Sequence, residues 1–410
     1  MKKALAIIAV VAALLAWGSQ LDDPLNSDAL SLLEKLDRSQ DSEAFFYLLG
    51  IDAPSNADPI EAGRTLYEEY RKAEEDAGYE IIDGLASERL TRPEGDFFCK
   101  SLEQGCLESL FTTDIDLDSL LSEQALLLER VTSLHGYSDY RTLTKPSSQE
   151  QLPRYEYISA AVRLQIASAI SASRKGHPEV ALRELLGNIG VLRRQMEIQD
   201  QFVGKMVYLM LIAEHLDVAS LVLSRHPGVM VSEAIPPLSL AEKRFDAVMA
   251  REIAMAYHTL KELDRHPEFW EIGGNAPGWW VRALYKPNMT INAMTPVYTR
   301  AIALSRLEPH EFARQITEKQ QIPATTSRIR NVAGDILNKM SPDYDGYVGR
   351  LSDLNTKIHL FNQHHHHNKK PDEITNPYFE GESAFVSQGR ICLTGPLEDK
   401  RNLRCLKISP

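Results

Sequence analysis

The sequence predicts an all-α fold: a multi-helix array of antiparallel helical hairpins with a small disulfide-pinned C-terminal hairpin or loop subdomain. Three observations predict it. Between residues 155 and 305, apolar residues recur every three or four positions, which is the spacing of a buried helix face. Glycine and proline gather between these segments, where helices end. The four cysteines lie as two close pairs, one of them near the C-terminus.

Residues 1–18 have the pattern of an export leader. The basic pair Lys2–Lys3 precedes an apolar run, Ala4–Trp17, and small residues precede Ser19 as at a cleavage site. A spanning helix needs about 20 residues, so the short run favours a cleaved signal peptide. No charge follows until Asp22, which leaves an uncleaved N-terminal anchor open. We expect no other segment to be long and apolar enough to cross a membrane.

The N-terminal part of the body predicts three helices. Ser27 or Asp28 caps a short apolar helix, and Ser42 caps a second one that ends at Gly50. Pro59 suits the first turn of a third helix that runs to about residue 76.

Three alternating acids, Asp114, Asp116 and Asp118, invite a calcium interpretation. An EF-hand loop that starts at Asp114 needs glycine and glutamate where this chain has Ser119 and Ala125. The acids are therefore interpreted as capping and first-turn residues of a helix over 120–134.

The middle of the chain has the strongest helical pattern. Apolar stripes predict helices near 155–174, 178–198 and 201–224, and Gly176 in the first junction predicts an antiparallel pair. A long helix from about Leu238 to Leu263 follows, with Glu252 on its apolar face.

Residues 264–287 contain prolines and glycines and predict a loop that carries Trp279 and Trp280. These tryptophans either anchor the loop on the core or line a groove together with Glu252. Further helices are expected over the ranges 289–305, 308–319, 327–339 and 344–351, with continuation over 352–363.

The C-terminal tail begins with four histidines, His364, His365, His366 and His367, in a polar segment. Imidazole binds borderline metals, but a built site needs fixed ligands and supporting partners, which this segment does not supply. The histidines are therefore weak metal candidates, and no cofactor is expected. Short apolar segments after residue 376 predict a small β-hairpin.

The cysteine pairs are interpreted as two local disulfides. Cys99 lies close to Cys106 and Cys392 close to Cys405, and each bridge would close a short loop worth ~2–3 kcal/mol. A zinc site or a redox-active thiol pair requires closer spacing than either pair has. Disulfides agree with export to an oxidising compartment.

Charge and missing motifs exclude several functions. The net charge of −12 at pH 7 argues against nucleic-acid binding, which needs a basic surface. The chain has no helical zinc-protease motif, no nucleophile elbow and no phosphate-binding glycine loop, so the sequence assigns no catalytic residue.

Several segments show a resemblance to a family. The run Phe45–Pro54, the run Asn331–Leu337 and Asn376–Tyr378 ahead of Gly381 resemble segments of exported, mostly helical proteins of Gram-negative bacteria. That family is uncharacterised and has no assigned activity. The resemblance implies export and one continuous fold, and it transfers no site residues.

Together these patterns predict a signal peptide or anchor over 1–18, a helical domain over 19–360 and an irregular subdomain over 361–410. The favoured function is a non-enzymatic protein-binding or assembly factor of the envelope, with another envelope protein as partner. The alternative is a periplasmic hydrolase whose site forms no sequence motif. We expect a periplasmic or secreted protein, or one held to the inner membrane through residues 4–17 and facing the periplasm.

Overall fold

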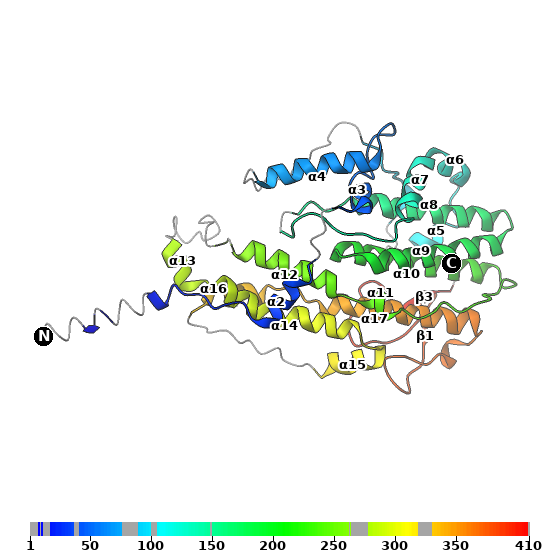
Figure 1. The fold of residues 1–410 in the computed structure, drawn as a ribbon. Helices are drawn as coiled ribbons and strands as arrows, with labels where there is room; N and C mark the ends of the chain where they lie inside the picture. Colours follow the sequence, from blue (N-terminus) through cyan, green and yellow to red (C-terminus); the bar gives the residue numbers. More distant parts are fainter. Residues whose placement is uncertain are drawn as a thin grey trace.

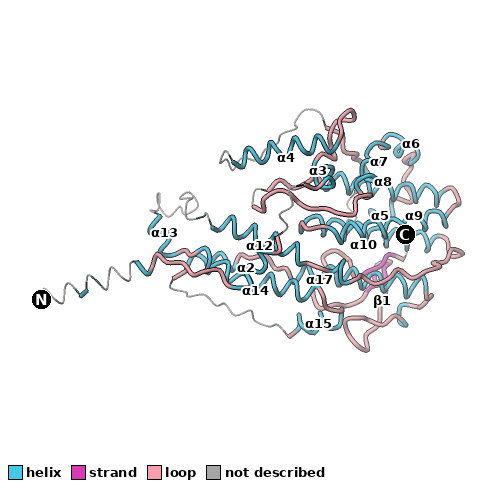
Figure 2. Tube along the Cα trace, viewed as in Figure 1, coloured by secondary structure: helices cyan, strands magenta, loops and turns pink. Residues whose placement is uncertain are grey.

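The fold is that of a mostly helical protein with a small sheet near its C-terminus (Figures 1 and 2). A computed structural model describes residues 7–8, 10, 17–36, 41–75, 89–99, 105–147, 150–261, 263, 278–318 and 330–408. In Figure 1 the helices lie in three layers. The upper layer holds α3 (Glu43–Leu49), α4 (Pro59–Glu75), α6 (Leu117–Glu123) and α7 (Ala125–Leu134); the middle layer holds α8 (Tyr155–Arg174), α9 (Pro178–Ile198) and α10 (Phe202–Arg225); the lower layer holds α12 (Asp246–Lys261), α14 (Pro287–Ser305) and α17 (Asp345–Phe361).

The N-terminal helices begin at side-chain caps. Ser42 accepts a hydrogen bond from the Phe45 amide, which confirms the predicted cap of α3. The cap of α2 is Asn26, not Ser27 or Asp28, and its side chain accepts from the Ala29 amide at 2.7 Å. The elements of this part are α2 (Ser27–Glu34), α3 (Glu43–Leu49), α4 (Pro59–Glu75), a 3₁₀ turn (Asp96–Phe98), α5 (Cys106–Ser109), α6 (Leu117–Glu123) and α7 (Ala125–Leu134).

The acidic segment before α6 is a helix start, as the sequence predicted. The Asp116 carboxylate accepts from the amides of Asp118 and Ser119. The single helix expected over 120–134 is wrong, because the chain breaks at Gln124, which ends α6 and precedes α7.

Helices α3 and α4 touch backbone to backbone. A Cβ added to Gly63 would lie 1.9 Å from the Phe46 carbonyl oxygen, and one added to Gly50 would lie 2.1 Å from that of Pro59. Only glycine permits so close an approach at these two positions.

Three long helices form the centre: α8 (Tyr155–Arg174), α9 (Pro178–Ile198) and α10 (Phe202–Arg225). Gly176 has a φ of 83°, so it makes the tight turn between α8 and α9 that the sequence predicted. We expected no segment after the leader to be long and apolar enough to cross a bilayer. Within the described ranges, α10 has that length and composition. Since 83% of its apolar window is buried inside the protein, α10 is the core helix of this fold.

The single helix predicted over 238–263 is also wrong. It is interrupted at Arg244, which has extended backbone angles, so that α11 (Leu240–Lys243) precedes α12 (Asp246–Lys261). The break places Phe245 in the core with no exposed surface. The remaining helices are α13 (Gly278–Leu284), α14 (Pro287–Ser305), α15 (Pro309–Thr317), α16 (Val332–Lys339) and α17 (Asp345–Phe361).

A three-stranded antiparallel sheet corrects the all-α expectation. Its strands β1 (Phe385–Ser387), β2 (Arg390–Cys392) and β3 (Cys405–Lys407) lie in chain order. Gln388 and Gly389 both have positive φ, as a two-residue hairpin turn requires. Cys392 lies directly opposite Cys405 in the β2–β3 ladder, and the two form a disulfide. The predicted hairpin thus gains a third strand that the disulfide fixes.

One hydrophobic core runs from Ala29 in α2 to Leu406 in β3. Strand β3 packs on both α10 and α17. Helix α17 passes directly into a π-helical turn at Asn362–His366, and the division expected between residues 360 and 361 stays a prediction. The junction of the sheet with α10 and α17 forms the site described next.

Candidate functional site

A small cleft lies where α10, α17 and the sheet meet. We call it the basic cleft, and its lining residues are Met210, Ala213, Glu214, Asp217, Lys357, Arg390, Arg401, Asn402, Cys405 and Lys407. Its cavity volume is about 20 Å³, which is room for about one water molecule. Pockets for small-molecule substrates are typically ~300–1,000 Å³, so the cleft suits a protruding group better than a whole small molecule.

Helix α10 supplies the two acids of the cleft. Glu214 and Asp217 are three positions apart and so lie on one face of a helix that is otherwise strongly apolar. Sequence reasoning missed them because it counted only the apolar positions of this run. The signal was present, since charges inside an apolar core helix are costly unless they are paired.

Lys357 on α17 neutralises Asp217. Its side chain is 1% exposed, and its Nζ lies 2.8 Å from Asp217 Oδ1. The same Nζ donates to the carbonyl oxygen of Cys405 at 2.6 Å. This ammonium group therefore links α10, α17 and β3 at the bottom of the cleft.

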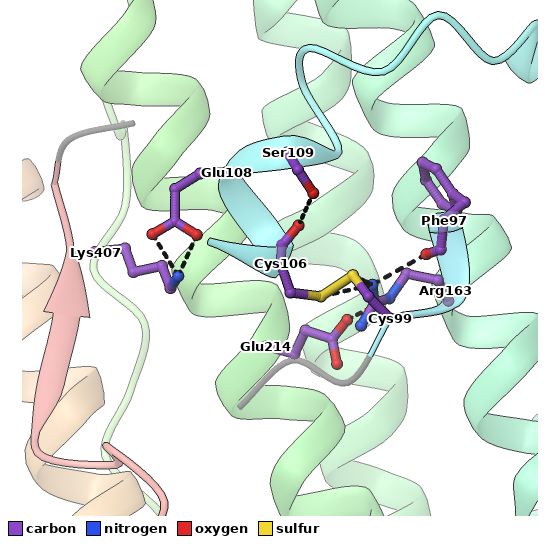
Figure 3. Close-up of a disulfide and its surroundings, with 8 residues drawn as sticks. All are labelled: Phe97, Cys99, Cys106, Glu108, Ser109, Arg163, Glu214 and Lys407. Carbon is purple, nitrogen blue, oxygen red and sulfur yellow. Dashed lines mark hydrogen bonds and ion pairs between the residues drawn. A yellow bond between two sulfur atoms is a disulfide. The ribbon is translucent and has the colours of Figure 1, made fainter. Parts of the chain in front are cut away.

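Lys407 on β3 is the second buried lysine that lines the cleft. Its side chain is 3% exposed, and its Nζ lies 2.5 Å from Glu108 on α5 (Figure 3). Its backbone amide donates to Asp217 Oδ1 at 3.2 Å, and its carbonyl oxygen accepts from the Ser220 hydroxyl. The last strand is thus held on α10 by charge as well as by apolar packing.

The other acid, Glu214, is paired with Arg163 on α8. The Arg163 Nε lies 2.6 Å from Glu214 Oε1, and the two side chains are 7% and 8% exposed. The guanidinium also donates to the Phe97 carbonyl oxygen at 3.2 Å and contacts the sulfurs of the Cys99–Cys106 disulfide at 3.8 and 3.7 Å (Figure 3). Each disulfide therefore borders the charged network around α10.

Two arginines at the cleft complete its lining. Arg390 on β2 is half-buried and Arg401 is exposed, and neither guanidinium has a hydrogen bond or ion pair to any residue that the structure describes. Burial first, and then repulsion by Arg401, lowers the pKa of the nearby Arg350. Because the two lysines are neutralised by acids, the charge that the cleft offers to a ligand is that of these two arginines.

The groove predicted around Trp279, Trp280 and Glu252 does not coincide with this cleft. The prediction of a loop is wrong for Trp279 and Trp280, because both lie in helix α13. Residues 264–277 of the predicted loop fall outside the described ranges. Glu252 accepts a hydrogen bond from the Tyr344 hydroxyl at 2.7 Å, and burial raises the pKa of Glu252. It belongs to a buried polar contact between α12 and Tyr344, the N-cap residue of α17.

His364, His365 and His366 lie in the π-helical turn after α17, where a polar loop was expected, and His367 is the C-cap of that turn. His364 faces the Lys369 carbonyl oxygen, His366 faces that of Val231, and His365 Nε2 lies 2.7 Å from the Ser220 hydroxyl. Their partners differ, and no group of three metal-ligating side chains occurs in the described part of the chain.

Comparisons with protein-family models, with curated proteins and with solved structures found no match. The interpretation of the basic cleft therefore depends on its own chemistry. Its two carboxylates are paired with buried cations, and its lining includes no histidine, serine or free thiol. A guanidinium presents a planar fork that matches a carboxylate, so the cleft is suited to binding an anionic group.

Proposed function

We propose that this chain is an exported envelope protein that binds another protein and does not catalyse a reaction. The basic cleft is the proposed contact, and the group it binds is a carboxylate of the partner, from an acidic side chain or a chain terminus.

The compartment is supported by covalent chemistry. Both disulfides close short local loops, and stable disulfides form in oxidising compartments. The apolar leader and the resemblance to exported Gram-negative proteins agree with a periplasmic location.

One observation carries the proposed contact: Arg390 and Arg401 line the cleft without partners among the described residues, while every other charge there is paired. A chain with net charge −12 repels acidic proteins in general. Two available guanidinium groups beside a rigid, cross-linked sheet therefore favour a local and oriented interaction with an acidic segment.

The hydrolase alternative has less support. It would need an acid or histidine free to move a proton at a pocket large enough for a substrate. The cleft offers neither property, since its acids are held by Arg163 and Lys357 and its cavity is about the size of one water.

Binding of poly-L-glutamate, measured by fluorescence anisotropy, tests the chemistry directly. We expect the double variant R390Q/R401Q to bind at least about tenfold more weakly than the wild type, because two charge-assisted contacts are lost. The matched control R183Q/K72Q removes the same charge from exposed positions on α9 and α4 and should bind as the wild type does.

Capture from the envelope of the native host extends the test to the real partner. Proteins that the wild type and R183Q/K72Q retain should be lost with R390Q/R401Q. Equal binding by the two double variants, with the probe and with captured proteins, would rule out the cleft as the contact.

A further inference from the structure

The segment that follows the N-terminal leader, residues 21–23, is bonded to the body at a fixed point. The Asp22 carboxylate accepts from the amides of Asn288 and Met289, at 2.7 and 3.2 Å, in the first turn of α14. Arg330, two residues before α16, donates to the Leu21 carbonyl oxygen at 3.0 Å and contacts Asp23. These bonds hold residues 21–23 beside the beginnings of α14 and α16.

The same end of the molecule exposes apolar side chains. Val332, Ile336 and Met340 recur every four positions along α16, so they share one face, and they are 41%, 57% and 76% exposed. Trp279, on the adjacent α13, is 66% exposed, and Leu21 is 48% exposed. We call these five residues the leader-side patch.

We propose that the leader remains attached as a membrane anchor and that the leader-side patch rests on the surface of the same bilayer. From Trp17, which closes the apolar run and is 67% exposed, to the bonded Asp22 the chain can reach at most about 17 Å. Once the run is inserted, Asp22 and the beginning of α14 to which it is bonded cannot lie farther than this from the lipid headgroups.

The composition of the patch fits a bilayer interface better than a protein partner. Tryptophan is enriched where headgroups meet acyl chains, and the exposed Arg282 and Lys339 on α13 and α16 suit an anionic leaflet. In Figure 1 α13 and α16 lie at one end of the body, while the sheet lies at the opposite end. A body seated in this way directs the basic cleft away from the membrane.

Quenching by lipid tests this arrangement on the full chain. The protein is reconstituted in phosphatidylethanolamine–phosphatidylglycerol vesicles with brominated acyl chains, which quench nearby tryptophans. The difference between the wild type and W279F isolates Trp279, and the difference between the wild type and W17F isolates the leader. We expect both tryptophans to be quenched.

Two double variants locate the contact. I336E/M340E should abolish the quenching of Trp279 and leave that of Trp17 unchanged. M230E/L240E alters two equally exposed apolar residues elsewhere, 83% and 63% exposed, and should change neither. If I336E/M340E fails to fold, the comparison of wild type with W279F decides alone.

Three results would overturn the proposal. One is quenching of Trp17 without quenching of Trp279, which shows an inserted leader and a body held off the lipid. Another is a chain from the native envelope that begins at Ser19. The third is a dimer in sedimentation that only I336E/M340E dissociates, which assigns the patch to a second copy.

Discussion

The ion pair between Arg163 and Glu214 provides a sharp test of how α8, α10 and the first disulfide are held together. Replacing Arg163 by methionine keeps most of the side-chain volume and removes the charge. It removes the Arg163 cation from Glu214, which is 8% exposed, and it deprives the Phe97 carbonyl oxygen of its donor. Loss of one partner of a buried pair costs about 3–5 kcal/mol, so R163M should lower the free energy of unfolding by that amount.

The double variant R163M/E214L distinguishes the cost of losing one partner from the net value of the pair. Apolar replacement of both partners is often neutral or stabilising, so the double variant should recover most of the loss. Urea denaturation followed by circular dichroism measures all three proteins. R314M, which breaks an exposed pair with Glu311 on α15, is the control and should leave the midpoint unchanged. The reasoning is refuted if the double variant is as unstable as R163M, or if R163M unfolds at the midpoint of R314M.

Three further predictions concern pH, packing and the second disulfide. Burial lowers the pKa of both His135 and His215 to about 4, so the unfolded chain takes up protons first as pH falls below 6.5. The free energy of unfolding should therefore be highest above pH 6.5 and decline towards pH 4, by up to ~3 kcal/mol per histidine. The variant H215L should flatten this decline, measured as the urea midpoint at each pH. A pH profile of H215L that equals that of the wild type contradicts this prediction. G63A should destabilise the fold by about 1–3 kcal/mol, because its Cβ would meet the Phe46 backbone. G187A, at an exposed helical position with open space around it, should stabilise the fold by ~0.5–1 kcal/mol. Thermal denaturation that ranks the two variants the other way would disprove the close approach of α3 and α4. Replacing the Cys392–Cys405 pair by alanines opens a short loop and should cost ~2–3 kcal/mol, and hydrogen exchange should rise first in β2 and β3; unchanged exchange there would show that packing alone orders the sheet.

The sequence located most helices because their signals are local. Ser42, Pro59 and Gly176 begin or end helices through their own backbone and capping chemistry, and the apolar stripes of α8 and α9 are visible in a single turn or two. Errors arose where a distant contact overrides such signals. The break at Arg244 places Phe245 in a core assembled from other helices. The residues near Arg244 include no glycine or proline that would predict this break.

The basic cleft could not be predicted from the sequence. The residues that the sequence offered as candidates, Trp279 and the histidine run, do not line it. Its arginines, Arg390 and Arg401, lie in a hairpin and a turn of the C-terminal segment, where a charged residue is ordinary. They form a site only because β3 packs against α10 and α17.

The sequence alone determined the helical class, the two local disulfides and most helix ends, since each depends on residues close together in the chain. Tertiary structure alone decided which charges are buried and paired, which arginines remain available, and where residues 21–23 are held on the body. The physical reason is that the energy of a charge depends on its distance from opposite charges and from water. For Asp217 and Lys357, 140 positions apart, only the packing of α10 on α17 sets that distance, and the bond between them is 2.8 Å.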